Sequence, residues 1–488
     1  MENEKYLYGA AVQGIQGYIF QTNELKNIIG ASELVERICK EEFSKFTDGK
    51  DSNSVLRAAG NIKHIFESEE DCKRVVREFP KHVMETAPGI TISQAVVKMV
   101  GKHADFATAV NELEQKLRVQ RNRPMPSVTT GLMGIKRSNK SGFPSVKIDK
   151  GEFLDAATCA KQKNYDYHIL CDKAFGEKLD ARSFAFDIKD ITLKNDWISI
   201  IHADGNGLGQ VVQKVGKNAA EFKEFSEKLD KATILSAQAA WDRIKMTDIL
   251  QSNPIPIRPI VLGGDDLTVI CRADFAIEYV AAFMQEFEIK TEEFFHDILQ
   301  KHNVFENGAK KLTACAGVAF IKSSFPFYYG YELAEALCGE AKKHAKALDK
   351  NLAPSCLMFH KVQDSFVEKY QEIEKRELLT KGGVSFKYGP YYMQEIGGKP
   401  TVEVLLEYVR ELDSEDGNKI KSHLRQWVSA LIEDEGVAEQ YKSRVTSLLS
   451  EGKLKNIFDK ITSLGENKTM AYDILSLASI KFQNTKTK

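Results

Sequence analysis

The pattern of hydrophobic and polar positions passes through the same order of elements twice along this chain. Short apolar runs predict β-strands, and apolar positions three or four residues apart predict helices. In the first half these patterns predict a strand, a helix, two strands around a turn, a helix, a strand and a helix, at residues 6–12, 15–40, 54–66, 69–88, 90–100 and 104–120. Ser68 and the three acidic residues after it mark the start of the second helix, because helix N-termini favour negative charge.

The same order returns about 200 residues further along the chain. The corresponding strands and helices are predicted at residues 197–204, 218–245, 256–272, 273–300, 312–322 and 331–348. Two copies of a β-α-β-β-α-β order indicate a duplicated ferredoxin-like, or palm, module.

The predicted fold class is α+β, with two tandem ferredoxin-like palm domains, an irregular insert between them and a C-terminal helical domain. The expected boundaries are 1–120 for the first palm, 121–195 for the insert, 196–362 for the second palm and 363–488 for the helical domain. The insert is expected to be irregular because it is rich in Pro, Gly, Ser, Lys and Asn. The last domain is expected to be helical because its pattern is amphipathic from Val402 to about Ile480.

Charge and cysteine content narrow the class of protein. The formal net charge is -1, so the chain has no global positive field for bulk nucleic acid, although a local basic groove is compatible with this value. No apolar run approaches the roughly 20 residues that span a bilayer, and the N-terminus has no secretory pattern. The eight cysteines are scattered without a CxxC pair, which is typical of reduced, buried thiols in a cytoplasmic protein.

Three aspartates lie where the second module is expected to bring strand ends together. Asp204 ends its first strand, and Asp265 and Asp266 lie in the turn of its strand pair. The first and third strands of such a sheet pair near its centre, so we expect these carboxylates to lie close together. Crowded carboxylates repel one another unless a cation neutralises them, and oxygen ligands suit Mg²⁺ or Mn²⁺. Two such divalent ions would lower the pKa of an attacking hydroxyl and stabilise a leaving pyrophosphate.

Glycines around these aspartates predict a phosphate-binding site. Gly263 and Gly264 permit a tight turn and let phosphates approach the backbone. The segment after the first aspartate is expected to open a helix whose free N–H groups cradle phosphate, and its residues are Gly205, Asn206, Gly207 and Leu208. Lys342 or its neighbour Lys343 is expected to reach the same phosphates. Each feature alone also has a simpler interpretation, since a GGDD turn can be only a hairpin and two lysines can be a solvated helix face.

The first module serves as an internal comparison. Alignment of the two copies puts Gln13 opposite Asp204, and residues 59–61 opposite residues 264–266. Neutral residues replace each of the three acids. We therefore expect the first module to fold like the second without catalysing, and to form one wall of the site.

Several segments together resemble one protein family. VQGIQGYIF and LKNIIGASELVE resemble its first palm, ISIIHADGNGLG and VLGGDDL resemble its second palm, and FPFYYGYELAEALCGEAKKHAK resembles the end of that palm. On these motifs the chain is similar to the large polymerase–cyclase subunit of type III CRISPR systems. The resemblance implies an enzyme that joins ATP 3′–5′ into cyclic oligoadenylates, which activate downstream effectors in antiviral defence. It also implies that Ser32 lines a second nucleotide site, and that RNA and other effector-complex subunits are candidate partners.

Two features of that family are missing from the pattern. The first palm is predicted to begin at about residue 5, which leaves no room for the N-terminal phosphohydrolase domain, and the cysteine-bearing zinc segment between the palms is absent. These departures favour a compact or free-standing relative. No membrane partner is expected, because no apolar run approaches the length that spans a bilayer.

Two other functions agree with the same residues. A diguanylate cyclase carries a related Gly-Gly-acid-acid turn, but such enzymes usually have one palm and dimerise to form the site. A scaffold that binds nucleotide or RNA is the non-enzymatic alternative, and retention of three acids in one palm argues against it. Lys136, Arg137 and Lys140 in the insert form either an RNA contact or a solvated loop.

Overall fold

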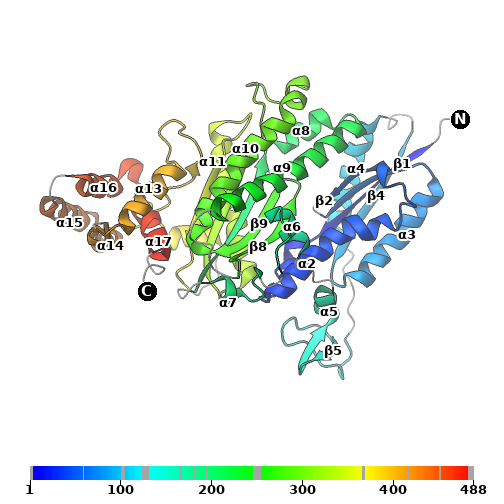
Figure 1. The fold of residues 1–488 in the computed structure, drawn as a ribbon, viewed down its shortest axis with the longest axis horizontal. Helices are drawn as coiled ribbons and strands as arrows, with labels where there is room; N and C mark the ends of the chain where they lie inside the picture. The colour runs from blue at the N-terminus through cyan, green and yellow to red at the C-terminus, as the bar shows by residue number, and fades with distance from the viewer. Residues whose placement is uncertain are drawn as a thin grey trace.

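The structure is a computed structural model that describes all residues except 1–3, 59, 101–104, 124–130, 164–167, 181–182, 193–195, 246–253, 365–368, 416, 450–451 and 482–488. Figure 1 shows the first palm in blue at one end, the second palm in green at the centre and the C-terminal helices in orange and red at the other end. Figure 1 shows β5 (Ser145–Asp149) and α5 (Ala156–Lys163) of the insert projecting from the molecule near the first palm, whereas α6 (Ile169–Phe175) lies against the second palm. No helix among the described residues is both long enough and apolar enough to cross a membrane.

The first palm is built on a four-stranded antiparallel sheet of order β2-β3-β1-β4. Its strands are β1 (Lys5–Gln13), β2 (Ser54–Ala58), β3 (Asn61–Phe66) and β4 (Thr91–Met99), and its helices are α1 (Ile15–Ile19), α2 (Leu25–Arg37), α3 (Glu69–Thr86) and α4 (Phe106–Arg121). Phe79 of α3 belongs to the core on one face of the sheet, and Leu113 of α4 belongs to the core on the other. Because both faces are covered, the central strand β1 is buried along most of its length, as its apolar run predicts.

The second palm repeats this arrangement and extends it. Its sheet has the order β12-β11-β10-β7-β9-β8, in which β8, β9, β7 and β10 match β2, β3, β1 and β4. The strands are β7 (Trp197–Asn206), β8 (Ile257–Gly263), β9 (Asp266–Arg272), β10 (Thr313–Lys322), β11 (Cys356–Lys361) and β12 (Tyr391–Tyr392), and the helices are α8 (Leu208–Val215), α9 (Ala219–Lys245), α10 (Ala276–Lys301) and α11 (Phe327–Leu348). The predicted fold class of two tandem ferredoxin-like palms is confirmed.

The hairpins of the two palms are in register. The first closes at the pair Ala58–Asn61, and the second closes at the pair Gly263–Asp266. Asn61 is therefore the counterpart of Asp266, as the alignment of the two copies predicts. Residue 59 of that alignment lies outside the described residues.

The predicted counterpart of Asp204 is wrong by two residues. Asn61 lies opposite Ala11 on β1. In the second palm the ladder between β7 and β9 runs to Ala203 and Leu267, so the next position sets Asp204 opposite Asp266. Ala11, and not Gln13, therefore occupies the place of the first aspartate. Side chains two positions apart on a strand share a face, so the hydrophobic pattern alone could not separate the two choices. The conclusion that a neutral residue replaces the acid is unchanged.

Other predicted elements differ in detail. The helix expected over 15–40 is two helices, α1 and α2, because the chain between them turns so that Asn23 Oδ1 accepts a hydrogen bond from the N–H of Phe327 at the start of α11 (2.9 Å). The insert contains regular structure that its composition did not predict, namely β5 (Ser145–Asp149), β6 (Glu152–Asp155), α5 (Ala156–Lys163), α6 (Ile169–Phe175) and α7 (Ile188–Ile191). The helix after Ser68 begins as predicted, with the Ser68 hydroxyl accepting from two backbone N–H groups.

The C-terminal region that follows β11 is mainly helical, as predicted, although its short strand β12 joins the edge of the second sheet. Its helices are α12 (Tyr370–Glu377), α13 (Val402–Asp413), α14 (Gly417–Glu433), α15 (Glu435–Leu448), α16 (Lys453–Ile461) and α17 (Ala471–Lys481). Tyr391 of β12 donates a hydrogen bond to Asp473 of α17 (2.7 Å), which links this region to the edge of the sheet.

Candidate functional site

The end of β7 and the tip of the β8–β9 hairpin meet at one edge of the second sheet. Strand β7 pairs with β9 in an antiparallel ladder that runs to Ala203 and Leu267. The next positions along the two strands are Asp204 and Asp266, so the two aspartates begin from directly opposed backbone positions. The predicted proximity of these two acids follows from this pairing of the first and third strands.

The turn that carries the GGDD motif is held by helix α9. Gly264 has φ of +63°, a conformation that residues with a side chain rarely adopt. Its N–H donates to Asp230 Oδ1 (3.1 Å), and its carbonyl accepts from the buried Thr233 hydroxyl (2.6 Å). The peptide groups on both sides of the Gly264 Cα are therefore fixed by a single helix, which defines the direction in which the next two aspartates leave the turn.

Gly205 makes room for the third aspartate. A Cβ atom added to Gly205 would lie 2.9 Å from Cβ of Asp265 and 2.9 Å from a methyl carbon of Leu208. A side chain at this position would therefore displace the turn. This close approach gives a packing reason for a glycine directly after Asp204, in addition to any contact with phosphate.

Among the described residues, one group of side chains has the donors and spacing to hold a metal ion. His202, Asp204 and Asp266 each offer one ligand atom, and these atoms lie within 4.8 Å of one another. His202 is not among the candidate residues that the sequence motifs indicate. The signal was present, because His202 lies two positions before Asp204 on the same strand and therefore on the same face. The carboxyl of Asp265 lies against Gly205, and its role as a metal ligand stays a prediction.

The protein environment changes the protonation of this group. Burial, followed by the Asp204 carboxylate, raises the pKa of Asp266 to about 7, although Lys342 acts in the opposite direction. Burial and the two neighbouring carboxylates also hold the pKa of Asp265 well above its usual range. Burial lowers the pKa of His202 to about 4, so its imidazole is neutral near pH 7, the form that coordinates metals. Thr268 fixes this ring through a contact of 3.2 Å between its hydroxyl and Nδ1.

Lys342 of α11 is the cation of the site. Its ammonium forms an ion pair with the Asp204 carboxylate and donates to the carbonyl of Gly205 (3.0 Å). Burial alone would lower the pKa of Lys342, but Asp204 outweighs that effect and the pKa is raised. Lys343 points to solvent with a side chain that is 77% exposed, so only the first of the two predicted lysines reaches the aspartates.

The segment after Asp204 is placed differently from its prediction. Strand β7 continues to Asn206, because Gly205 and Asn206 still pair with β10. The buried Asn206 amide donates to the Thr313 hydroxyl (3.2 Å) and the Cys315 sulfur (3.3 Å). Gly207 caps α8 with φ of +81°, and Leu208 is the first residue of that helix. Contacts of these residues with a nucleotide stay predictions.

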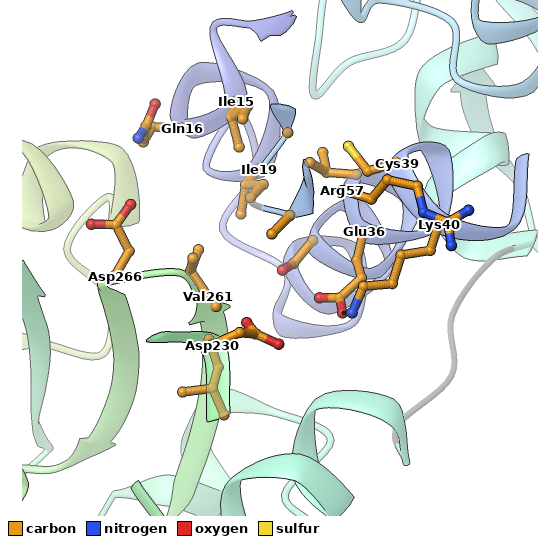
Figure 2. Close-up of a pocket in the computed structure, with 16 residues that line it drawn as sticks. Ile15, Gln16, Ile19, Glu36, Cys39, Lys40, Arg57, Asp230, Val261 and Asp266 are labelled. Carbon is orange, nitrogen blue, oxygen red and sulfur yellow. Dashed lines mark hydrogen bonds and ion pairs between the residues drawn. The ribbon is translucent and has the colours of Figure 1, made fainter. Parts of the chain in front are cut away.

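A cavity between the palms borders the aspartate site. It is lined by Gly60 at the hairpin tip of the first palm, by Gly263 and Asp266 of the second, and by Ser32 of α2. Figure 2 shows Asp266 and Asp230 on the second-palm side, with Gln16 and Lys40 across from them on the first. The buried Ser32 hydroxyl donates to the Ile260 carbonyl of β8, and Phe20 stacks on Tyr331 at 4.6 Å between ring centroids. The two palms are therefore in direct contact around this cavity.

The comparison with known families agrees with this geometry. Residues 197–351 match the family model of the second palm domain of Cas10/Cmr2. The central domain of this chain is a Cas10/Cmr2 second palm. The recognition of a type III CRISPR large subunit from the sequence motifs is thereby confirmed. Among curated proteins, none matches the chain.

Solved structures share the fold over nearly the whole chain. A chain of a Csm1–Csm4 cassette in complex with pppApA matches with a TM-score of 0.60 and 13% identity, covering 98% of this chain and 69% of that chain. The cassette without ligand matches with a TM-score of 0.60 and 13% identity, over 98% of this chain and 70% of that chain. The cassette in complex with cA4 matches with a TM-score of 0.57 and 13% identity, over 98% of this chain and 69% of that chain. At this identity the likeness establishes the fold.

Proposed function

We propose that this chain is a metal-dependent nucleotidyltransferase that joins ATP into cyclic oligoadenylate-type messengers. The observation that carries the proposal is the convergence of Asp204, Asp266 and His202, of which Asp266 also lines a cavity between the two palms. A site that joins two nucleotides needs a place for each of them. The second palm offers the acids, and the first palm offers an opposite wall with no acid at the matching positions.

The donor set fits a divalent cation of the Mg²⁺ or Mn²⁺ type. Two carboxylates and one neutral imidazole lie within reach of one point, and carboxylate oxygens are the preferred ligands of these ions. Asp204 and Asp266 would hold the first ion with His202 beside them, and Asp265 would contribute to a second. Bound there, the ions would supply charge neutralisation for the triphosphate and for the leaving pyrophosphate.

The chain's own residues then orient the substrates. Lys342 is positioned to exchange its contact with Asp204 for a phosphate oxygen of the donor nucleotide, since its ammonium already lies between Asp204 and Gly205. A Cβ atom added to Gly264 would meet no atom within 4 Å, so the approach to the turn is open at this residue. The acceptor nucleotide would lie on the Ser32 side of the cavity, with its 3′-hydroxyl toward the aspartates.

The reaction is a substitution at the α-phosphorus. The oxygen of the 3′-hydroxyl forms the new bond to phosphorus, the bond to the bridging oxygen of the β-phosphate breaks, and pyrophosphate leaves with that electron pair. The hydroxyl proton is lost to solvent. Repetition within one bound oligonucleotide, with its own 3′-hydroxyl as the last acceptor, closes a ring.

The solved relatives support this choice of substrate. Cassettes of the same fold have been crystallised with ATP, with pppApA and with cA4, which are a substrate, a linear product and a cyclic product of such a reaction. Each of these structures also contains Csm4, so we propose that the present chain likewise works beside other subunits of an effector complex, in the presence of RNA. Its messenger would act on a separate effector.

The test is to incubate the purified protein with Mg²⁺ or Mn²⁺ and each nucleoside triphosphate in turn, with and without RNA, and to identify products by mass spectrometry. We expect cyclic or linear oligoadenylates from ATP alone among the four. The variant Asp265→Ala/Asp266→Ala should make none. A product from GTP would favour a diguanylate cyclase. Absence of both product and metal-dependent ATP binding would leave the scaffold function and would contradict the proposal.

A further inference from the structure

Among the residues that the structure describes, no strand pairs with the outer side of β4, the last strand of the first sheet. Strand β4 is nine residues long and stands last in the order β2-β3-β1-β4. A groove runs beside it, with Gln94, Ala95 and Val96 as the floor. The flank of α4 forms the wall, through Thr108, Asn111, Glu112, Gln115, Lys116, Val119 and Gln120. Long edge strands present unpaired N–H and C=O groups and pair readily with another strand.

The backbone groups that face this edge can be identified. Val12 donates its N–H to Gly60 on the β3 side, so the even-numbered residues of β1 face β3 and the odd-numbered ones face β4. The register between β1 and β4 then directs the even-numbered residues of β4 outward. Lys116 confirms this direction, because its ammonium donates to the Val96 carbonyl (3.0 Å) from the groove. Ile92, Gln94, Val96 and Lys98 therefore carry the outward groups.

The second palm shows what fills the matching place. Ser93 of β4 and Cys315 of β10 are counterparts, since each lies opposite the same position of the first strand. The strand β11 pairs with β10 from Cys315 to Phe320 and also packs against α11. The groove beside β4 and α4 is therefore the place that a strand occupies in the other copy of the module.

We propose that β4 pairs with β4 of a second copy of this chain, which joins two first-palm sheets into one. Two-fold symmetry requires an antiparallel pair. With the axis at Ala95, the middle residue of the strand, Gln94 and Val96 of one copy exchange hydrogen bonds with Val96 and Gln94 of the other. Ile92 and Lys98 then pair at the two ends, so all four outward residues are used.

The charges on the wall of the groove favour contact with the same wall of a second copy of the chain. Glu112 and Lys116 form an ion pair one turn apart on α4 (2.8 Å). Around a two-fold axis the two α4 helices run antiparallel across the seam, so Glu112 of one copy faces Lys116 of the other. The remaining polar residues of the wall are Thr108, Asn111, Gln115 and Gln120, and their hydroxyl and amide groups can both donate and accept. The surface is therefore neutral and complementary to its own copy.

The experiment measures the mass of the full-length protein in solution across a dilution series by sedimentation equilibrium. We expect a monomer–dimer equilibrium for the natural chain. Val96→Pro removes an outward N–H that takes no part in the ladder with β1, so the monomer should keep its circular dichroism and lose the dimer. A protein that is monomeric at every concentration would overturn the proposal.

Charge exchange on α4 identifies the interface independently of the strand. Glu112→Lys and Lys116→Glu should each weaken the dimer at least about tenfold, because like charges then meet across the axis. An equimolar mixture of these two variants should dimerise again. Lys453→Glu on helix α16, which Figure 1 shows at the opposite end of the molecule from β4, should leave the dimer unchanged. A dimer that survives both single substitutions and Val96→Pro lies at another surface and would equally overturn the proposal.

Discussion

Lys342 and Asp204 form an ion pair that joins the last helix of the second palm to the end of its first strand. The three carboxyl groups at this edge lie beside the partly buried ammonium of Lys342, and this one positive charge balances them only in part. A site of this kind is suited to substrates that arrive with divalent cations.

Replacement of Lys342 tests whether this ammonium binds phosphate. Lys342→Met should reduce kcat/KM for ATP by about tenfold to a hundredfold, the range expected for loss of one hydrogen bond to a charged group. Lys343→Met is the matched control, since the Lys343 side chain is exposed and its ammonium lies 3.7 Å from the Glu340 carboxylate. Equal activity of the two variants in steady-state assays would argue that Lys342 has no contact with substrate.

Thr233 is expected to position the GGDD turn through the Gly264 carbonyl (2.6 Å). Thr233→Val keeps the shape of the side chain but leaves that carbonyl without its donor, so we expect a loss of about 1–3 kcal/mol in the free energy of unfolding and a lower kcat. Thr233→Ser should restore both quantities. Ser236→Ala, on the same helix and bonded only to Ala232, controls for loss of a buried hydroxyl. A kcat unchanged in Thr233→Val would refute the positioning role.

His202 is expected to contribute to metal binding. His202→Ala should weaken Mn²⁺ binding, measured by calorimetry on the protein alone, by at least about tenfold. Thr268→Val removes the contact at 3.2 Å that orients the ring and should produce a smaller loss. An Mn²⁺ affinity that is the same in His202→Ala and the natural protein would remove this residue from the ligand set.

Asp473 gives the C-terminal region a defined dependence on pH. Burial raises the pKa of this carboxyl from 3.8 to about 7, although Tyr391 acts in the opposite direction. The folded state therefore binds a proton more tightly than the unfolded state. The stabilising contribution is complete below about pH 4 and is lost as the pH rises through about 7.

The measurement is Tm by differential scanning fluorimetry between pH 5 and pH 8. Asp473→Asn should flatten the decline in Tm over this interval and should raise Tm at pH 8 relative to the natural chain. Tyr391→Phe removes the hydrogen bond that favours the charged form, so the pKa of Asp473 should rise further and the decline in Tm should extend to higher pH. A Tm profile that Asp473→Asn leaves unchanged would show that this carboxyl does not titrate in that interval.

The order of elements could be predicted because each palm repeats a strong hydrophobic pattern. The pairing of β7 with β9 follows from that order, and it brings Asp204 and Asp266 together as expected. The additional strands β11 and β12 could not be predicted from the repeat, since both follow the repeated unit and β12 has only 2 residues. The hairpin of β5 and β6 in the insert could not be predicted, because it lies in a segment of mixed polar composition.

The finer details of the site depend on tertiary packing. Asn206 was expected in a phosphate-binding helix start, but pairing with β10 extends the strand through it. Ala11 and Gln13 lie two positions apart on β1 and share a face of the sheet. The hydrophobic pattern alone therefore cannot decide which of them corresponds to Asp204. The sequence did not predict a role for His202, because a single histidine within an apolar run is usually only a buried core residue.

The central claim is that the acids of the second palm catalyse bond formation between nucleotides. The most direct measurement follows pyrophosphate release and oligonucleotide products from ATP with Mn²⁺, for the natural chain and for the near-isosteric variants Asp204→Asn and Asp266→Asn. The account predicts cyclic oligoadenylates from the natural chain and a loss of product in both variants, with their folded structure kept in circular dichroism. Products formed at the same rate by all three proteins would contradict it.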